Sequence, residues 1–333
     1  MATVLPAGKL PADLLQRLLR HLPRRKPVLI GAAYGEDAAV IEDGRQCWVI
    51  TTDPITFAVE ELGWYLVQVN ANDVAAMGAR PEFFTATLLF PPGASAEQVE
   101  ACFDQIRRAC GELDVAWIGG HTEITPAVNQ PVACGQMIGR VDRAALVLSS
   151  GARPGDDLVL IGWLGIEGTA VLAREKHAQL REHFSAEWLD RAARYLFDPG
   201  IGVTRAAQVA CRAAQIHALH DPTEGGLSAA VREMGTASGL GALVWKRALP
   251  AGEHTVKLCE FFGLDLLGLL SSGSLLAVCD PWETSRLLES LRKEGWPAAR
   301  IGEARPSEEG FRLDDRPLPE FARDELARVL VSS

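Results

Sequence analysis

The chain has 333 residues, of which 48% are hydrophobic and 23% are charged, and 43 acidic against 33 basic side chains give a formal net charge of −10 at pH 7. This composition excludes a disordered chain and, at about 150 residues per domain, predicts two domains. The acidic balance argues against a non-specific nucleic-acid binder, which needs a basic surface. Apolar runs are too short for a transmembrane helix, and residues 1–10 lack a signal-peptide pattern. We therefore expect a soluble, cytoplasmic protein with no nucleic-acid and no membrane partner.

Seven cysteines are scattered along the chain, and none of them forms a C-x-x-C pair. This spacing argues against a disulfide framework or a zinc site. Reduced, buried thiols are the expected state.

Hydrophobic periodicity predicts alternating helices and strands in the first half. A face of leucines over residues 11–22, closed by Pro23, predicts an amphipathic helix. Residues 60–78 and 95–113 also have helical spacing. The strands expected around these helices are residues 28–30, 38–41, 47–52, 83–90, 115–118 and 132–141.

Ser, Gly and Pro gather at residues 148–156, which predicts a boundary between a domain at 1–150 and a domain at 151–333. The charged segment 176–194 is expected to form a solvated helical hairpin. Both halves mix strands with helices, which favours α/β or α+β domains. The elements expected in the second half are strands 158–161 and 216–219 and helices 168–174, 203–214, 226–238 and 321–330.

The common nucleotide-binding and catalytic motifs are absent from the sequence. There is no G-x-x-x-x-G-K-[ST] phosphate loop, no G-x-G-x-x-G after a strand, no G-x-S-x-G elbow and no H-E-x-x-H helix. A G-x-x-G-x-x-G run at Gly162, Gly165 and Gly168 follows a predicted strand, but strand-to-helix turns often carry glycines. An enzyme built on this chain must use a less common arrangement.

Dispersed carboxylates in the first half could hold a magnesium phosphate. Asp37 follows a glycine-containing loop, and Asp53 ends the predicted strand 47–52. Asn70 and Asp73 are three apart in a predicted helix and project from one face. Mg²⁺ takes oxygen ligands, one or two carboxylates together with substrate phosphates. The alternative for each acid is a turn or a helix cap, although apolar neighbours of Asp73 make an unpaired carboxylate there costly.

A Gly–Gly pair in the first half is a second candidate ligand contact. Gly119 and Gly120 would let the backbone approach a ligand, and His121 and Glu123 would add polar ends. The alternative is an ordinary tight turn after the strand 115–118.

A glycine-containing segment in the second half is the third candidate. Residues 220–226 (HDPTEGG) join a predicted strand to a predicted helix. Free amides at a helix N-terminus attract phosphate. The alternative is that Thr223 or Asp221 only caps the helix and that His220 is a packed core histidine.

Seven motifs occur in order along the chain: GEDAAVI (35–41), ITTD (50–53), NANDVAAMGARP (70–81), GGHTEI (119–124), HDPTEGGL (220–227), ASGLG (237–241) and SSGSLL (271–276). Together they resemble the PurM-like (AIR synthase-related) superfamily over nearly the whole chain. That group contains aminoimidazole ribonucleotide synthetase, HypE, thiamine-monophosphate kinase and selenophosphate synthetase. HDPTEGGL looks most like HypE, and NANDVAAMGARP is shared with the thiamine-monophosphate kinases.

The resemblance implies a two-domain PurM-like fold. Its N-terminal α/β domain, residues 1–150, would bind ATP and pair with its twin into a barrel across a homodimer, and residues 151–333 would form an α+β domain. The resemblance implies ATP and Mg²⁺ as cofactors, with Asp37, Asp53 and Asp73 as metal and phosphate ligands and with Asp53 and Asp73 catalytic. The nucleotide contacts it implies are Gly35, Asp37, Thr52, Asn70, Gly119, Gly120, His121 and Glu224.

The sequence departs from parts of this pattern. HypE ends in a flexible tail with a terminal cysteine that accepts a carbamoyl group, whereas this sequence ends at Ser333 and its last cysteine, Cys279, lies on a predicted strand. The N-terminal cysteine and the lysine partner of selenophosphate synthetases are missing, since the first cysteine is Cys47. His121 stands where several relatives have an acid.

The resemblance implies an ATP- and Mg²⁺-dependent enzyme that activates an oxygen of a small or protein-borne substrate by phosphoryl transfer. A small-molecule kinase like thiamine-monophosphate kinase is the second hypothesis, and a non-catalytic nucleotide-binding accessory protein is the third. The resemblance to HypE also implies a role in hydrogenase maturation. The acceptor is an unidentified small molecule or protein.

Overall fold

The structure, a computed structural model, describes residues 5, 8–23, 25–56 and 60–330. Its contacts divide the chain into two compact units. The N-terminal unit consists of Arg25–Gly31 and Asp37–Leu146, and the C-terminal unit consists of Met1–Arg24, Ala32–Glu36 and Val147–Ser333. Residues 331–333, and residues 1–4 and 6–7 of the segment that lacks a signal-peptide pattern, lie outside the described residues.

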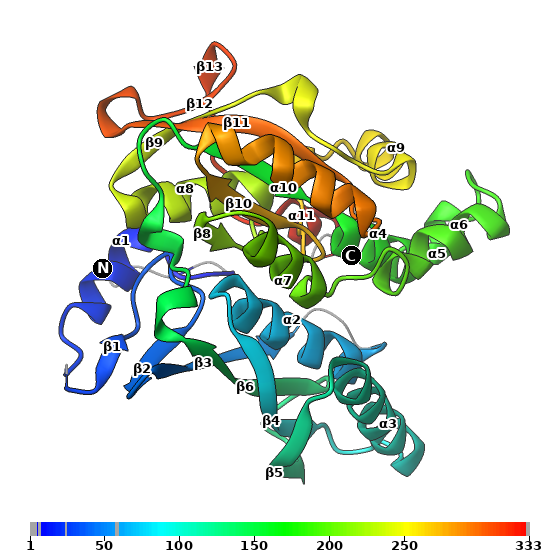
Figure 1. Cartoon of the computed structure of the whole chain (residues 1–333). Helices are drawn as coiled ribbons and strands as arrows, with labels where there is room; N and C mark the ends of the chain where they lie inside the picture. The colour runs from blue at the N-terminus through cyan, green and yellow to red at the C-terminus, as the bar shows by residue number, and fades with distance from the viewer. Residues whose placement is uncertain (1–4, 6–7, 24, 57–59, 331–333) are drawn as a thin grey trace, which may run out of the picture. The chain divides into compact units, whose positions relative to one another are not determined.

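The N-terminal unit is a six-stranded sheet that carries two helices on one face (Figure 1). The strand order is β1-β2-β3-β6-β4-β5, and neighbouring strands are antiparallel except for the parallel pair β4–β5. The elements are β1 (Val28–Ile30), β2 (Ala39–Asp43), β3 (Gln46–Ile55), α2 (Leu62–Ala76), β4 (Arg80–Phe90), α3 (Ala96–Leu113), β5 (Ala116–Ile124) and β6 (Val132–Asp142).

The alternation of side chains along β3 sets the two faces of this sheet. Cys47, Val49 and Thr51 are buried, whereas Trp48 is half-buried and Thr52 is exposed. α2 contacts β3, β4 and β6, and α3 packs on α2, so every residue of α2 is buried. The polar side chains of α2 therefore meet the odd-numbered residues of β3.

Residues 119–123, expected as a loop after a short strand, form the middle of β5 instead. Ala86 of β4 pairs with Gly120, and Thr87 pairs with His121. Gly120 has φ +150°, and a Cβ there would lie 1.8 Å from the carbonyl oxygen of Ala86. Pairing this close requires glycine at position 120, whereas a Cβ at Gly119 would have no neighbour within 4 Å. The Gly–Gly segment is therefore part of a strand and not a turn.

The C-terminal unit contains a seven-stranded sheet in the order β13-β12-β9-β11-β7-β10-β8. Its neighbouring strands are antiparallel except for the parallel pair β12–β9. The strands are β7 (Asp157–Ile161), β8 (Ile216–His220), β9 (Leu240–Val244), β10 (Leu275–Cys279), β11 (Ala298–Pro306), β12 (Phe311–Leu313) and β13 (Arg316–Pro317). The helices are α1 (Ala12–Leu19), α4 (Ile166–Glu175), α5 (His177–Leu180), α6 (Ala186–Ala193), α7 (Thr204–Ala213), α8 (Gly226–Ser238), α9 (Glu253–Phe262), α10 (Pro281–Lys293) and α11 (Glu325–Leu330).

Helices cover both faces of the central strands of this sheet. β7 and β10 are buried along their whole length. On one face, Leu158 and Leu160 share a hydrophobic core with Leu227 and Val231 of α8. On the other face, α7 contacts β8 and β10, and α10 contacts β7 and β11 (Figure 1). The helices packed on both faces hold the ends of β7, β8 and β10 in place, and polar side chains lie at these strand ends.

Two sequence expectations in this unit need correction. The segment 176–194 forms α5 and α6, but Leu180 and Leu189 are buried and α6 packs on α4, so the hairpin is partly embedded and not simply solvated. The final helix begins at Glu325, four residues later than expected at 321.

Within the described part of the chain, no helix combines the length and the apolar character needed to cross a membrane.

Candidate functional site

Asn70 ties helix α2 to the end of strand β3. The backbone N–H of Asp53 donates to Asn70 Oδ1 at 2.9 Å, and Asn70 Nδ2 donates to the Asp53 carbonyl at 3.2 Å and to the Leu66 carbonyl at 2.8 Å. Asn70 is fully buried, which makes these bonds to its amide costly to lose. The amide thereby fixes the backbone from which the Asp53 carboxylate projects.

Asp73, one helical turn beyond Asn70, is held by Thr51. The Thr51 hydroxyl donates to Asp73 Oδ2 at 2.6 Å and also lies 3.3 Å from the backbone carbonyl of Asp37. Asp73 is buried, with 6% of the residue exposed, so this hydrogen bond offsets part of the cost of burying its charge. The three-residue spacing places Asn70 and Asp73 on one face of α2, as the sequence predicts.

Thr52 lies on the opposite face of β3. It is exposed, and its hydroxyl donates to the Gly135 carbonyl at 2.7 Å. Strand alternation separates its side chain from those of Thr51 and Asp53. The structure therefore brings Asp53, Asn70 and Asp73 to one side of the sheet and Thr52 to the other.

Gly119, Gly120 and His121 lie in the edge strand β5. In the register of the sheet, Thr52 pairs with Gln136 of β6, which pairs with Thr85 of β4, which pairs with Gly119. The sheet thus places Thr52 and Gly119 in one row, three strands apart. His121 is exposed, and its Nε2 lies 3.4 Å from Glu123 Oε2.

Gly35 and Glu224 belong to the C-terminal unit, whereas the other predicted site residues belong to the N-terminal unit. Gly35 has φ +85°, and a Cβ there would lie 2.6 Å from the Glu233 carbonyl of α8. Glu224 precedes α8, and its Oε1 accepts the backbone N–H of Lys9 at 3.4 Å. Both residues therefore lie beside α8.

The amides at the start of α8 are less available than the sequence suggests. Gly225 N–H donates to Asp324 Oδ2 at 2.6 Å, and Gly226 N–H donates to the Thr223 carbonyl at 3.0 Å. Asp324 is 99 residues away in sequence, so local reasoning could not find this contact. The carboxylate occupies a donor that a phosphate would otherwise use.

His220 pairs with an acid on α8. Its Nε2 lies 3.0 Å from Glu233 Oε2, and Lys9 Nζ lies 3.6 Å from Glu233 Oε1. Burial alone would raise the pKa of Glu233, but the hydrogen bonds and charges of His220 and Lys9 outweigh it and lower that pKa to about 2. The pair keeps Glu233 ionised beside the loop 220–226.

Two buried acids next to this loop have raised pKa values. Burial raises the pKa of Glu167, at the start of α4, to about 7, and the charge of Asp324 adds to the shift. Burial also raises the pKa of Asp324 to about 6, against the lowering effect of the Gly225, Leu270 and Leu326 amides. Both carboxyls therefore bind protons more tightly in the folded chain than in the unfolded one.

The carboxylates proposed as metal ligands do not form a closed cage. Among the described residues, the one group of three acidic, histidine or cysteine ligand atoms lying within 4.8 Å of one another is Asp156, His217 and Asp280. Asp37, Asp53 and Asp73 are more widely spaced than that. Their oxygen-only chemistry fits Mg²⁺, which uses one or two carboxylates and completes its shell with water and substrate phosphates.

Sequence reasoning missed three residues that shape these surroundings. The sequence shows Thr51 only as a member of the ITTD motif, yet Thr51 is the donor to Asp73. Asp324 and Lys9 reach the loop 220–226 from distant parts of the chain. The spacing of two residues between Thr51 and Asp53 puts them on one face of a strand and could have pointed to Thr51, whereas the other two residues carry no local signal.

Two family models match most of the chain. Residues 35–141 match the N-terminal domain of AIR synthase related proteins, and residues 153–314 match the C-terminal domain of the same proteins.

Individual proteins show the same similarity. The carbamoyl dehydratase HypE of Azotobacter vinelandii is 31% identical over 265 residues, which cover 78% of this chain and 74% of that protein. A crystal structure of the hydrogenase maturation protein HypE in complex with ATP matches with a TM-score of 0.71 at 23% identity, covering 94% of this chain and 91% of that one. A thiamine-monophosphate kinase from Stenotrophomonas maltophilia matches with a TM-score of 0.69 at 24% identity, covering 92% and 96%. The structural matches establish the two-domain fold.

Proposed function

Because the chain belongs to the AIR synthase-related (PurM-like) family and is a relative of HypE, we propose that it is an ATP- and Mg²⁺-dependent enzyme. It would activate an oxygen of a small or protein-borne substrate by phosphoryl transfer. The observation that carries the proposal is the pair of fixed acids at the contact of α2 with β3, where Asn70 holds Asp53 and Thr51 holds Asp73. The HypE relationship also supports a role in hydrogenase maturation and a protein acceptor.

The proposed roles divide the site by chemistry. Asp37, Asp53 and Asp73 would hold Mg²⁺ together with the nucleotide phosphates, and Mg²⁺ would neutralise phosphate charge when bound. Asn70 and Thr51 keep the acids in place before substrate arrives, so little reorganisation is needed on binding. The domain 1–150 would carry ATP binding and dimerisation. The remaining nucleotide contacts would come from Gly35, Thr52, Gly119, Gly120, His121 and Glu224.

Nucleotide binding is expected to raise the thermal stability of the full chain in a Mg²⁺-dependent way. ATP at 100 times its dissociation constant should add about 2.7 kcal/mol to the free energy of unfolding. The measurement is a thermal unfolding scan with ATP, ADP or AMP, each with Mg²⁺ and with excess chelator. An unchanged midpoint with every nucleotide would remove the basis for the proposal and favour an accessory protein that retains the fold alone.

The similarity to a thiamine-monophosphate kinase supports a second candidate, a small-molecule kinase. Product analysis separates the two enzymes. A kinase leaves the γ-phosphate on the added acceptor, whereas a HypE-like dehydratase releases free phosphate with loss of water from the substrate. Neighbouring hydrogenase maturation genes would favour the dehydratase.

We also propose a homodimer formed through the face of the six-stranded sheet opposite α2 and α3. Within the described N-terminal unit, that face carries half-buried apolar side chains, including Trp48, Phe83 and Ile138, and ends at the exposed strand β5. Covering such a face with a second copy would bury apolar area and complete the sheet edge. The family resemblance supports a barrel as the form of this dimer.

A charge placed in the middle of this face is expected to dissociate the dimer. Thr87 is exposed on β4 and points to the uncovered face, so Thr87→Arg should convert a dimer to a folded monomer by sedimentation analysis. Glu112→Arg on the exposed surface of α3 is the control and should remain dimeric. Retention of the dimer in Thr87→Arg would place the interface elsewhere.

A further inference from the structure

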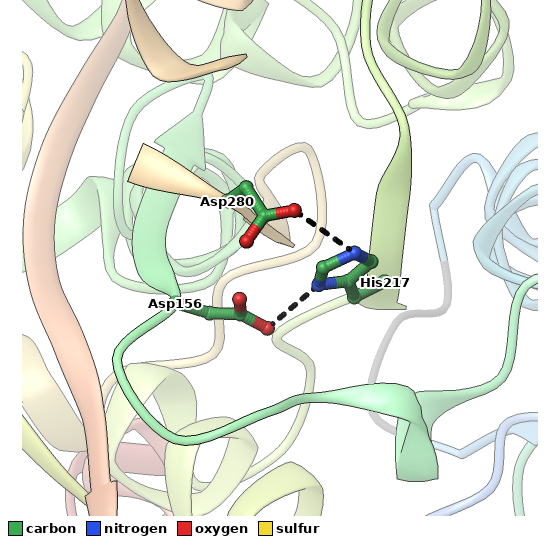
Figure 2. A group of neighbouring side chains, drawn as sticks. All are labelled: Asp156, His217 and Asp280. Carbon is green, nitrogen blue, oxygen red and sulfur yellow. Dashed lines mark hydrogen bonds and ion pairs between the residues drawn. The ribbon is translucent and has the colours of Figure 1, made fainter. Parts of the chain in front are cut away.

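A buried Asp–His–Asp group lies at one end of the seven-stranded sheet (Figure 2). Asp156 precedes β7, His217 is the second residue of β8, and Asp280 follows β10 at the N-terminus of α10. β10 lies between β7 and β8 and runs antiparallel to both, which brings these three ends together. The loop 220–226 leaves the opposite end of β8, so the group is separate from the proposed nucleotide contacts.

One ring nitrogen of His217, Nδ1, has a hydrogen-bond partner, whereas the other, Nε2, has none among the described residues. Nδ1 lies 2.9 Å from Asp156 Oδ2, which also accepts the Arg153 backbone N–H at 2.8 Å. A carboxylate only accepts, so Nδ1 carries the proton. In the neutral ring, Nε2 then presents a lone pair toward Asp280 Oδ2, 3.6 Å away, and it forms no hydrogen bond among the described residues.

This distance fits two ligands of one cation better than it fits a direct hydrogen bond. A nitrogen and an oxygen bound at about 2.1 Å in tetrahedral geometry are about 3.4 Å apart. A carboxylate bonded to the far nitrogen of a metal-binding histidine is the usual arrangement around such a ligand, because it fixes the ring and its tautomer. Asp156 is placed to do this for His217.

The negative charge of the two carboxylates in this group also favours a bound cation. The side chains of Asp156 and His217 are each 2% exposed, and that of Asp280 is 23% exposed. Neighbouring Asp157 is paired with Arg300 at 2.6 Å, but within the described chain no Lys or Arg forms an ion pair with Asp156 or Asp280. Two carboxylates thus share one imidazole in a nearly dry place, where uncompensated negative charge is costly.

We propose that His217 Nε2 and the Asp280 carboxylate bind a divalent first-row transition cation, with Asp156 as the positioning residue and water in the remaining positions. A site with an imidazole nitrogen suits Zn²⁺ and its neighbours, whereas Mg²⁺ prefers oxygen ligands alone. The scattered cysteines argue only against a thiolate zinc site. The partial exposure of Asp280 gives the cation access from solvent.

The test is Zn²⁺ binding by the full chain, measured in competition with a chromophoric chelator in excess Mg²⁺. The wild-type chain should bind one Zn²⁺ equivalent that Asp280→Asn and His217→Gln weaken at least tenfold. Zn²⁺ should also raise the unfolding midpoint of the wild type and not that of Asp280→Asn. His177→Ala removes an exposed histidine of the same unit and should leave the binding unchanged.

Equal Zn²⁺ affinity in the wild type and in Asp280→Asn, or no Zn²⁺ binding by the wild type, would overturn the proposal. His217 would then only link Asp156 and Asp280 within the fold. Because Asp280 forms no side-chain cap bond on α10, Asp280→Asn is expected to fold, and its metal-free unfolding midpoint checks this. The readout uses no nucleotide, so it stands apart from the proposed ATP reaction.

Discussion

Asp53→Asn is expected to lower ATP turnover by about 100-fold or more while leaving the chain folded. The change removes one negative charge at the end of β3 but keeps the shape of the side chain. The two bonds between Asn70 and residue 53 involve only the backbone of that residue, so the substitution does not break them. Phosphate release from ATP in Mg²⁺ measures the effect, and the thermal unfolding midpoint checks the fold.

Asp104→Asn provides the matched control for this loss. Asp104 lies on the exposed surface of α3, where it forms an ion pair with Arg107 at 3.0 Å. The same chemical change in the same unit should leave turnover and the unfolding midpoint nearly unchanged. Near-normal turnover in Asp53→Asn would remove Asp53 from the proposed phosphate-binding acids.

Glu167→Gln is expected to stabilise the chain at pH 8 and to flatten the dependence of its stability on pH. Burial raises the pKa of Glu167 from 4.5 to about 7, so the folded chain holds its proton more tightly than the unfolded chain. The contribution of this group to stability is fully present below pH 4.5 and is lost as the pH rises through 7. This pKa shift corresponds to a loss of roughly 3 kcal/mol of stability in the wild type once Glu167 is ionised. The Glu167→Gln variant does not have this loss, because glutamine stays neutral.

Unfolding midpoints of wild type and Glu167→Gln at pH 5 and pH 8 test this expectation. The midpoint of the variant should exceed that of the wild type by several degrees at pH 8, and the difference should shrink at pH 5. Part of the pH dependence should persist, because the pKa of Asp324 is raised in the same direction to about 6. Glu182→Gln, an exposed change in the same unit, is the control, and its stability should depend on pH as that of the wild type does. The same pH dependence in Glu167→Gln would contradict the prediction.

The helices and strands with strong local signals were predictable from the sequence. Ser95 and Gln98 form the capping box that starts α3, and this is a contact between residues three apart. β1 and α8 begin and end where their periodicity indicates. The segment 119–123 was not predictable, because its strand conformation depends on β4, more than 30 positions earlier.

For the site residues too, local spacing predicted some features, whereas others depend on tertiary contacts. The spacing of Asn70 and Asp73 predicts their common helical face, and apolar neighbours predict that Asp73 needs a partner. The identity of that partner, Thr51, depends on how α2 lies on β3. The availability of the Gly225 amide depends on Asp324, which only the folded chain brings to it.

Residue type and local spacing are enough to identify the family, the ordered motifs and the acids that could hold a magnesium phosphate. Contacts within the folded chain are needed to show which hydroxyl holds Asp73, which amides remain for an anion, and that Asp156, His217 and Asp280 meet. These contacts join residues tens of positions apart. They form only when strands pair and helices pack, so no local pattern encodes them.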